Sequence, residues 1–183
     1  MRRMGAFCLA LAFTAALAVT ALAAEEGGPR RTYMVPTQKS VEIAGEQVVF
    51  QTCTVYDEQG YETNYVKLRD VAYALMGTQA QFSVEYDGST KITTGAAYSP
   101  DGTEMNLLPQ GGESGMVKAV LTVDGVGVAK EAILVRDAAG GGYTYFKLRD
   151  LGEAMGFPVE WDGQRGIYID TQPMETEETT AEG

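Results

Sequence analysis

One six-residue phrase occurs twice in the chain, and this internal repeat constrains the fold more than any other feature. YVKLRD at 65–70 returns as YFKLRD at 145–150, 80 positions later. Further along, FSVEYDG at 82–88 corresponds to FPVEWDG at 157–163, now 75 positions later. The first copy therefore carries five extra residues, at about 77–81. Such a repeat indicates two similar structural units, and residues shared by both copies belong to the fold more than to a site.

The first 23 residues have the pattern of a secretory signal peptide. A basic start, Arg2 and Arg3, precedes an apolar run, and the small residues Ala21-Leu22-Ala23 offer a cleavage site. The alternative is a retained anchor, but the run is shorter than the roughly 20 apolar residues that a membrane span requires. We therefore predict a secreted, extracellular protein whose mature chain starts near Ala24, with no membrane span after processing.

The acidic composition limits the partners of the mature chain. Processing leaves 12 basic residues against 25 acidic ones, a net charge of −13. Nucleic acids and anionic membranes are bound through Lys and Arg, so neither is an expected partner. One cysteine, Cys53, remains after processing, so no intramolecular disulfide can form. Because Cys53 lies in an apolar strand pattern, we predict a buried, inert thiol rather than a reactive one.

Each copy has the same predicted order of elements: a hairpin, a strand entering the repeated phrase, a short helix and a final hairpin. At Leu68 the alternating pattern of a strand changes to a helical stripe. The stripe comprises Leu68, Val71, Ala72 and Leu75, and Leu148, Leu151, Gly152 and Met155 reproduce it. Asp-Gly turns at 87–88 and 162–163 predict the final hairpins. We predict an α+β fold of two tandem repeats, each a short helix packed on a small, mainly antiparallel sheet.

Turn-rich and polar stretches separate these units. Units of this size without disulfides are near the lower limit for a stable core, so we expect the two repeats to pack together. The predicted organisation is a signal peptide at 1–23, an N-terminal tether at 24–39, repeat one at 40–94, a connector at 95–118, repeat two at 119–171 and an acidic disordered tail at 172–183.

The second copy carries the motif of a known family. KLRDLGEAMG at 147–156 is followed by VEWD at 159–162 and IYI at 167–169. This resembles the copper amine oxidase N-terminal domain-like family, stalk-type modules of secreted proteins in Gram-positive bacteria. The first copy departs from the motif, because Tyr86 stands in place of the Trp and the helix exit is longer. The resemblance implies a spacer, docking or wall-associated role more than any reaction.

The residue types argue against oxidase chemistry. Copper requires imidazole or soft sulfur ligands, and the chain contains no His. The cofactor tyrosine of amine oxidases lies within Asn-Tyr-Asp or Asn-Tyr-Glu, whereas Asn64-Tyr65 precedes Val66. Without His, the usual Ser-His-Asp and Cys-His nucleophile systems are also missing. We predict a protein that is not an enzyme and carries no cofactor and no metal.

Carboxylates leave two alternatives open. A glycosidase needs two acids roughly 5–9 Å apart, and Glu85 with Asp87, or Glu160 with Asp162, could form such a pair. Their repetition at hairpin positions favours solvated turn residues instead. The segment at 101–104 contains Ca²⁺-type oxygen ligands, but its spacing matches no EF-hand loop and favours an ordinary acidic turn.

The arginines of the repeated phrase and the aromatic residues of the final hairpins are the candidate ligand contacts. Arg69 and Arg149 could bind a carboxylate of a wall peptide, or pair structurally with a nearby acid. Tyr86 and Trp161 could stack on sugar rings, but their position in the strand predicts a half-buried packing role.

We predict a secreted, non-catalytic binding or spacer module at the bacterial cell envelope, with a cell-wall component or an envelope protein as partner. The predicted contact surface comprises Lys147, Arg149, Trp161 and Tyr168. The alternatives are a carboxylate-based cell-wall or glycan hydrolase and an inert structural stalk.

Overall fold

The computed structural model describes residues 30–105, 111–136 and 142–174. Of these, 58% are in strands and 11% in two helices, and ten strands form one mixed sheet. The first copy comprises β1 (Arg30–Ile43), β2 (Glu46–Tyr56), β3 (Glu62–Lys67), α1 (Leu68–Ala74), β4 (Phe82–Tyr86) and β5 (Thr90–Thr94). The second repeats this order as β6 (Gly112–Val123), β7 (Val126–Arg136), β8 (Gly142–Lys147), α2 (Leu148–Met155), β9 (Glu160–Asp162) and β10 (Gly166–Ile169).

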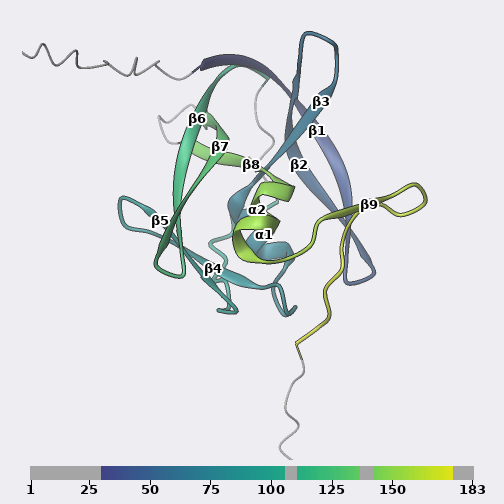
Figure 1. Ribbon diagram of the computed structural model, residues 1–183, viewed down its shortest axis with the longest axis vertical. Coiled ribbons are helices and arrows are strands. Elements are labelled where there is room, and N and C mark those ends of the chain that lie inside the picture. Colours follow the sequence, from purple (N-terminus) through teal and green to yellow (C-terminus); the bar gives the residue numbers. More distant parts are fainter. Residues whose placement is uncertain (1–29, 106–110, 137–141, 175–183) are drawn as a thin grey trace, which may run out of the picture.

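The predicted fold class, an α+β pair of repeats that each have their own sheet, is wrong. The strands of both copies form a single sheet in the order β4-β5-β6-β7-β8-β3-β2-β1-β10-β9, and β6 also pairs with β1. In Figure 1 the strands surround the two short helices, which lie in the middle of the molecule. The reason is an exchange of hairpins: β5 pairs in parallel with β6 of the other copy, and β10 with β1.

The pairing registers relate the two copies by an approximate twofold arrangement. The register of β1–β2 returns in β6–β7, and that of β2–β3 in β7–β8, each with both strands shifted by 80 positions. At the centre β3 pairs with β8, where Val66 lies opposite Phe146 and Tyr65 lies opposite Lys147. Corresponding residues of the two copies thus meet at the middle of the sheet.

Both faces of this central region are buried. Along β3, Val66 packs in the core that contains the helices, whereas Tyr65 belongs to a second core on the other face. The helical stripe predicted for the first copy is confirmed, since Leu68, Val71 and Leu75 are all buried in the helix core. The second core comprises Met34, Cys53, Tyr65, Ile133, Val135 and Tyr145.

The strands extend beyond the predicted repeats. Residues 30–39, predicted as tether, form the first part of β1, and residues 112–118 of the predicted connector begin β6. These two segments pair with each other, from Arg30 opposite Met116 to Met34 opposite Gly112. The signal peptide at 1–23, residues 24–29 of the tether and residues 175–183 of the tail lie outside the described residues. No helix in the described part of the chain is long and apolar enough to span a membrane.

The five-residue insertion of the first copy holds the end of the described chain. Thr78 forms a β-bridge with Pro173. The amide of Gln79 donates to the carbonyl of Gln172 at 2.8 Å, and the amide of Met174 donates to the carbonyl of Gly77 at 2.8 Å. The insertion therefore determines where the C-terminal segment leaves the fold.

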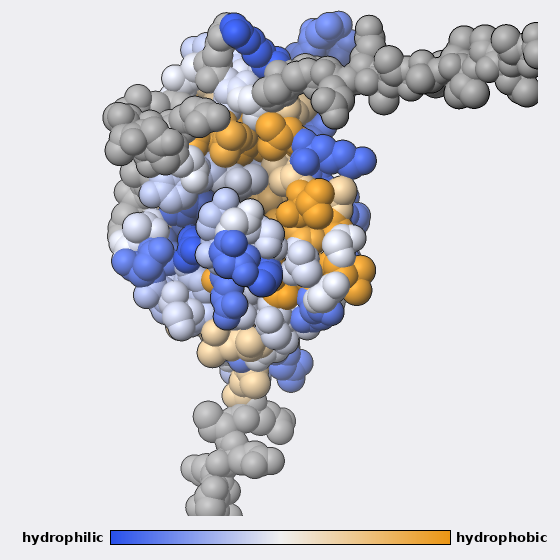
Figure 2. All heavy atoms as spheres, turned by 90° about the vertical axis from the view of Figure 1, so that its left-hand side faces the viewer, coloured by the Kyte–Doolittle hydropathy of each residue, from blue (hydrophilic) through white to orange (hydrophobic). Residues whose placement is uncertain are grey.

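The surface is mixed in polarity. Figure 2 shows the side of the molecule on which β5, β6 and β7 lie, and its apolar areas are interrupted by hydrophilic ones. Val120 of β6 and Val126 of β7 are exposed apolar residues of these strands. Scattered apolar side chains of this kind are ordinary on a protein surface and do not indicate a docking face.

Candidate functional site

The four predicted contact residues do not share one surface. In the hairpin of β9 and β10, Trp161 lies opposite Ile167, and Tyr168 lies opposite Glu160. Residues directly opposite in an antiparallel pair share a face, and neighbours along a strand alternate. Trp161 and Tyr168 therefore project from opposite faces of the hairpin and cannot contact one ligand side by side.

The two basic residues of the predicted surface also have different surroundings. Lys147 is 2.8 Å from a carboxylate oxygen of Glu131, and its ammonium lies 5.7 Å from the ring centre of Tyr65. Arg149 is exposed and has no hydrogen bond or ion pair with any described residue. Lys147 thus has a structural role, whereas Arg149 is open to solvent.

The predicted half-buried role of Tyr86 and Trp161 is wrong. Their side chains are 70% and 68% exposed. Their strand neighbours Val84 and Val159 pack against the core, as their position in the strand predicts. The difference arises because β4 and β9 are the two edge strands of the sheet, so their outer ends project beyond the core.

In the first copy, the counterparts of three predicted contact residues line one cleft. Lys67, Arg69 and Tyr86 correspond to Lys147, Arg149 and Trp161. They border a cleft of about 400 Å³, which we call the helix-start cleft, together with Tyr143 of β8. The predicted contact surface in the second copy stays a prediction, and this cleft lies in the first copy.

The sequence repeat does not identify Tyr143 as a cleft residue, because the two copies differ at this position. Its counterpart in the first copy is Thr63, so the signal is a difference between the copies. Tyr143 lies at the start of β8, and its ring is 5.1 Å from the ammonium of Lys67. Because β8 pairs with β3, an aromatic side chain of the second copy reaches the helix start of the first.

Arg69 is held at the rim of the cleft by the connector. It lies in the first turn of α1, immediately after β3. Its guanidinium donates to the hydroxyl of Tyr98 at 3.1 Å and lies 3.4 Å from a carboxylate oxygen of Asp101. Burial, reinforced by Glu104, raises the pKa of Tyr98 to about 12, so its hydroxyl stays protonated. Arg69 is thus oriented, while its side chain remains 31% exposed.

Behind Arg69 lies a buried ion pair. The ammonium of Lys67 is 2.9 Å from a carboxylate oxygen of Asp70, and both side chains are only 1% exposed. Lys67 also donates to the carbonyl of Thr103 at 2.7 Å, and the amide of Met105 donates to Asp70 at 3.1 Å. Burial raises the pKa of Asp70 despite these partners, and its second oxygen has no hydrogen bond with any described residue. The pair anchors the connector to the start of α1.

The segment at 101–104 is an acidic turn, as its sequence favoured. Glu104 accepts hydrogen bonds from the hydroxyl of Tyr98 and from the amides of Asp101 and Gly102. Burial opposes ionisation of Glu104, but these hydrogen bonds outweigh it and lower the pKa. Within the described ranges no group of three or more His, Cys, Asp or Glu side chains could hold a metal ion. The carboxylate oxygens here are used by the turn itself.

The two hairpin aspartates, Asp87 and Asp162, are engaged by their own turns. Asp87 accepts hydrogen bonds from Lys91 and Ser89, which lower its pKa. The amides of Arg165 and Gln164 lower the pKa of Asp162 in the same way. A glycosidase acid needs a raised pKa in order to donate a proton near neutrality. The lowered pKa values therefore do not suit Asp87 or Asp162 to the role of the general acid.

Cys53 is inert, as its strand position predicted. It is fully buried in the second core, and burial raises the pKa of its thiol to about 12. The thiolate is the reactive form of cysteine, so this residue is neither a nucleophile nor a metal ligand at neutral pH.

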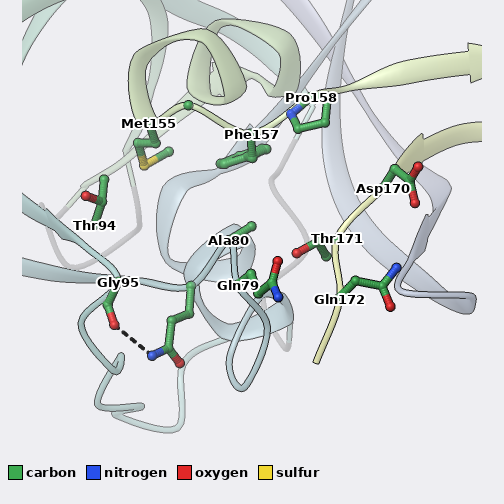
Figure 3. Close-up of a pocket in the computed structure, with 12 residues that line it drawn as sticks. Gln79, Ala80, Thr94, Gly95, Met155, Phe157, Pro158, Asp170, Thr171 and Gln172 are labelled. Atoms are coloured by element: carbon green, nitrogen blue, oxygen red, sulfur yellow. Dashed lines mark hydrogen bonds between the residues drawn. The ribbon is translucent and has the colours of Figure 1, made fainter. Parts of the chain in front are cut away.

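A second cleft, of about 440 Å³, lies where the two copies meet. Figure 3 shows its lining: Gln79 and Ala80 of the insertion face Met155 and Phe157 at the exit of α2. The ring of Phe157 stacks on that of its counterpart Phe82, with centres 6.5 Å apart. The lining is mostly carboxamide, hydroxyl and apolar groups, so this cleft offers less charge for recognition than the helix-start cleft.

No family model, curated protein or solved structure matches the chain in the comparisons with known proteins. The resemblance to the copper amine oxidase N-terminal domain-like family therefore stays a prediction from the motif. Residue chemistry in the clefts is the basis for a functional proposal.

Proposed function

We propose that the protein is a secreted, non-catalytic binding module of the bacterial cell envelope and that the helix-start cleft is its contact surface. The observation that carries the proposal is the position of Arg69 beside the rings of Tyr86 and Tyr143. Extracellular location follows from the signal-peptide pattern at 1–23, and the envelope from the resemblance to wall-associated modules. A spacer role is compatible with this arrangement, because the strands of both copies form a single sheet and the cleft lies on that one unit.

The chemistry of the cleft fits a ligand with a carboxylate and a flat or apolar body. A guanidinium presents planar donors that match a carboxylate, and the exposed ring of Tyr86 offers a face for stacking beside the half-buried ring of Tyr143. Arg69 lies 3.4 Å from Asp101, which is itself about half exposed at 49%. A ligand carboxylate can replace this long, solvated contact at little cost, because exposed ion pairs contribute only about 0–1 kcal/mol. We therefore propose a peptide with a free carboxylate, such as a wall peptide, as the ligand.

Binding without turnover is supported by the state of the nearby acids. Glu104 is occupied by three donors, and Asp70 is buried against Lys67. A general acid or base must reach the substrate and exchange a proton with it. Neither Glu104 nor Asp70 meets both requirements, and hydrogen bonds from Thr103 lower the pKa of the half-exposed Asp101, which disfavours proton donation by it.

The test is a calorimetric titration of the chain, purified from residue 24 onward, with a short peptide that has a free C-terminal carboxylate. Losing one charge-assisted hydrogen bond of about 1.5–3 kcal/mol weakens Kd roughly 10- to 150-fold. We expect this loss for Arg69→Gln and for the amidated peptide, and a smaller loss for Tyr86→Ala. Arg149→Gln is the matched control and should bind normally.

Tyr86→Ala also guards against misfolding, because the Tyr86 side chain is mostly exposed and its removal leaves the core intact. Equal binding of the free and amidated peptides contradicts the proposal. Release of soluble sugar or peptide from purified cell wall supports the hydrolase alternative instead, and no binding of either peptide supports the inert stalk.

A further inference from the structure

The buried pair at the start of α1 holds an amine and a carboxyl group together. Nζ of Lys67 lies 2.9 Å from Oδ1 of Asp70, and each side chain is only 1% exposed. The carbon atom that the amine would attack is bonded directly to this oxygen. Groups held in this way, with reacting atoms about 3–3.5 Å apart, react far faster than the same groups free in solution. The pair therefore has the proximity that amide formation requires.

The surroundings favour the uncharged forms that such a reaction needs. A neutral amine is the nucleophile, and a protonated carboxyl group can release one oxygen as water. Removing an acid and an amine from water penalises their charged forms, so proton transfer between them becomes easier. Burial raises the pKa of Asp70 despite its hydrogen bonds with Lys67 and Met105. This carboxyl group therefore takes up a proton more readily than an exposed aspartate does.

The two carboxylate oxygens of Asp70 have different partners. Oδ1 accepts from the amide of Met105 at 3.1 Å and faces the ammonium of Lys67. Oδ2 is buried and has no hydrogen bond with any described residue. A buried acceptor without a partner is destabilising. Loss of Oδ2 as water would remove this unfavourable group from the core and leave Oδ1 with its donor.

An amide between the two side chains would keep the hydrogen bonds that the pair has now. Its nitrogen retains one hydrogen, which can donate to the carbonyl of Thr103, 2.7 Å from Nζ of Lys67. Its oxygen, the former Oδ1 of Asp70, still accepts from the amide of Met105. A backbone amide in this position also stabilises the negative charge that develops on the oxygen while the bond forms. Reactant and product are thus held by the same backbone groups.

The second copy has the same two residues without these conditions. Lys147 is 36% exposed and pairs with Glu131 at 2.8 Å. Asp150 is half-buried rather than buried. Water stabilises the charged forms of an amine and a carboxyl group, and these forms do not condense. Lys147 and Asp150 therefore provide a comparison within one chain, in which the residue types are the same and the burial differs.

We propose that Lys67 and Asp70 condense to an intramolecular amide that cross-links the end of β3 to the first turn of α1. Lys67 first transfers a proton to Asp70. Nζ then attacks Cγ of Asp70, so that a C–N bond forms and the bond from Cγ to Oδ2 breaks. Oδ2 leaves as water with two protons, the one transferred first and one more from the attacking nitrogen, and no oxidant or reductant is needed. The closed ring includes Arg69, so the cross-link fixes this residue at the rim of the helix-start cleft.

The experiment measures the intact mass of the chain, purified from residue 24 onward and incubated folded at neutral pH before denaturation. We expect a mass lower than that of the sequence by one water molecule. Trypsin cleaves after Lys and Arg, so the unmodified chain yields residues 40–67 and 70–91 as separate peptides. The cross-linked chain should instead yield 40–69 joined to 70–91, and fragmentation should place the bond between Lys67 and Asp70.

Lys67→Arg keeps the positive charge but replaces the amine with a guanidinium that stays protonated. This variant should have the full mass of its sequence. Lys147→Arg is the matched control and should keep the loss of one water. Circular dichroism shows whether each variant is folded, and if Lys67→Arg is not, fragmentation of the parent chain decides alone.

Three results each overturn the proposal. The first is the full sequence mass for the folded parent chain after incubation. The second is a loss of water that persists in folded Lys67→Arg. The third is a loss that fragmentation places at an Asp-Gly turn, where an aspartate can cyclise onto the following amide with the same change in mass.

Discussion

Lys67 and Lys147 occupy the same position in the two copies, but their ion pairs differ in burial. Lys67 is almost fully buried, with its charge shared between Asp70, the carbonyl of Thr103 and the ring of Tyr143. Lys147 forms an exposed ion pair with Glu131. The side chain is the same, so its contribution to stability is decided by the segment that covers it.

This difference predicts opposite outcomes for one substitution. Lys67→Met removes one partner of a buried pair, leaves the Asp70 carboxylate uncompensated and should cost about 3–5 kcal/mol of unfolding free energy. Lys147→Met breaks an exposed pair and should cost about 0–1 kcal/mol. Chemical denaturation of the two variants measures both values. Equal losses would show that the connector residues around Thr103 do not bury the charge of Lys67 in solution.

At the scale of elements, the two helices end differently because only α1 is followed by the five-residue insertion. α2 ends at Gly156, whose backbone is left-handed with φ of 82°, and the chain turns back at once. The amide of Phe157 donates to the carbonyl of Gly152 at 3.0 Å, so the returning chain lies directly against the helix. In the first copy the five-residue insertion follows α1, so the chain does not turn back at once. The residue of α1 that corresponds to Gly152 is Ala72, which is buried.

Gly152→Ala should therefore destabilise the protein, although alanine is the better helix former. A Cβ at this position would lie 2.5 Å from the carbonyl oxygen of Phe157 and 2.8 Å from a methyl group of Val159. Overpacking of this kind costs about 1–3 kcal/mol, against a helix-propensity gain of about 1 kcal/mol. We expect a net fall in Tm by calorimetry.

Gly127→Ala is the control for this substitution. Nothing lies within 4 Å of a Cβ at Gly127, and its backbone has no left-handed φ. This variant should keep the Tm of the parent chain. A Gly152→Ala variant as stable as Gly127→Ala would contradict the close approach of the exit segment to α2.

At the scale of the whole molecule, each copy is completed by the other. β1 pairs with β6 and β10, β3 pairs with β8, and β5 pairs with β6. Separating the copies would therefore expose strand edges at every one of these places. Unpaired strand edges bind other chains and favour aggregation.

The first copy alone, residues 30–105, should not fold cooperatively. It would lose β6 as a neighbour of β5, β6 and β10 as neighbours of β1, and β8 as the neighbour of β3. It would also lose the residues of β7 and β8 that fill the second core. Circular dichroism during thermal unfolding should show no sharp transition, whereas residues 30–174 should unfold in one step. Mixing fragments 30–105 and 111–174 should restore the transition. A fragment 30–105 with the Tm of the longer chain would show two independent units.

Much of the local structure could be predicted from the sequence, because it depends on neighbouring residues. The strands around the repeated phrase, the helical stripe from Leu68 and the Asp-Gly hairpins follow from side-chain periodicity and turn chemistry. The inert environment of Cys53 followed from the same alternation. These features depend on residues a few positions apart, so local spacing is enough to specify them.

Strand partners and exposure were decided by the tertiary structure. The first strand and the Asp-Gly turn of the two final hairpins are alike in sequence, FSVEYDG against FPVEWDG, so local sequence does not tell which hairpin pairs with β1. Only the shared sheet selects β10. The same sheet leaves Trp161 on an outer edge and brings Tyr143 beside Lys67, which forms the cleft in the first copy rather than the second. Contacts between residues about 80 positions apart depend on which strands become neighbours, and periodicity along the chain carries no information about that choice.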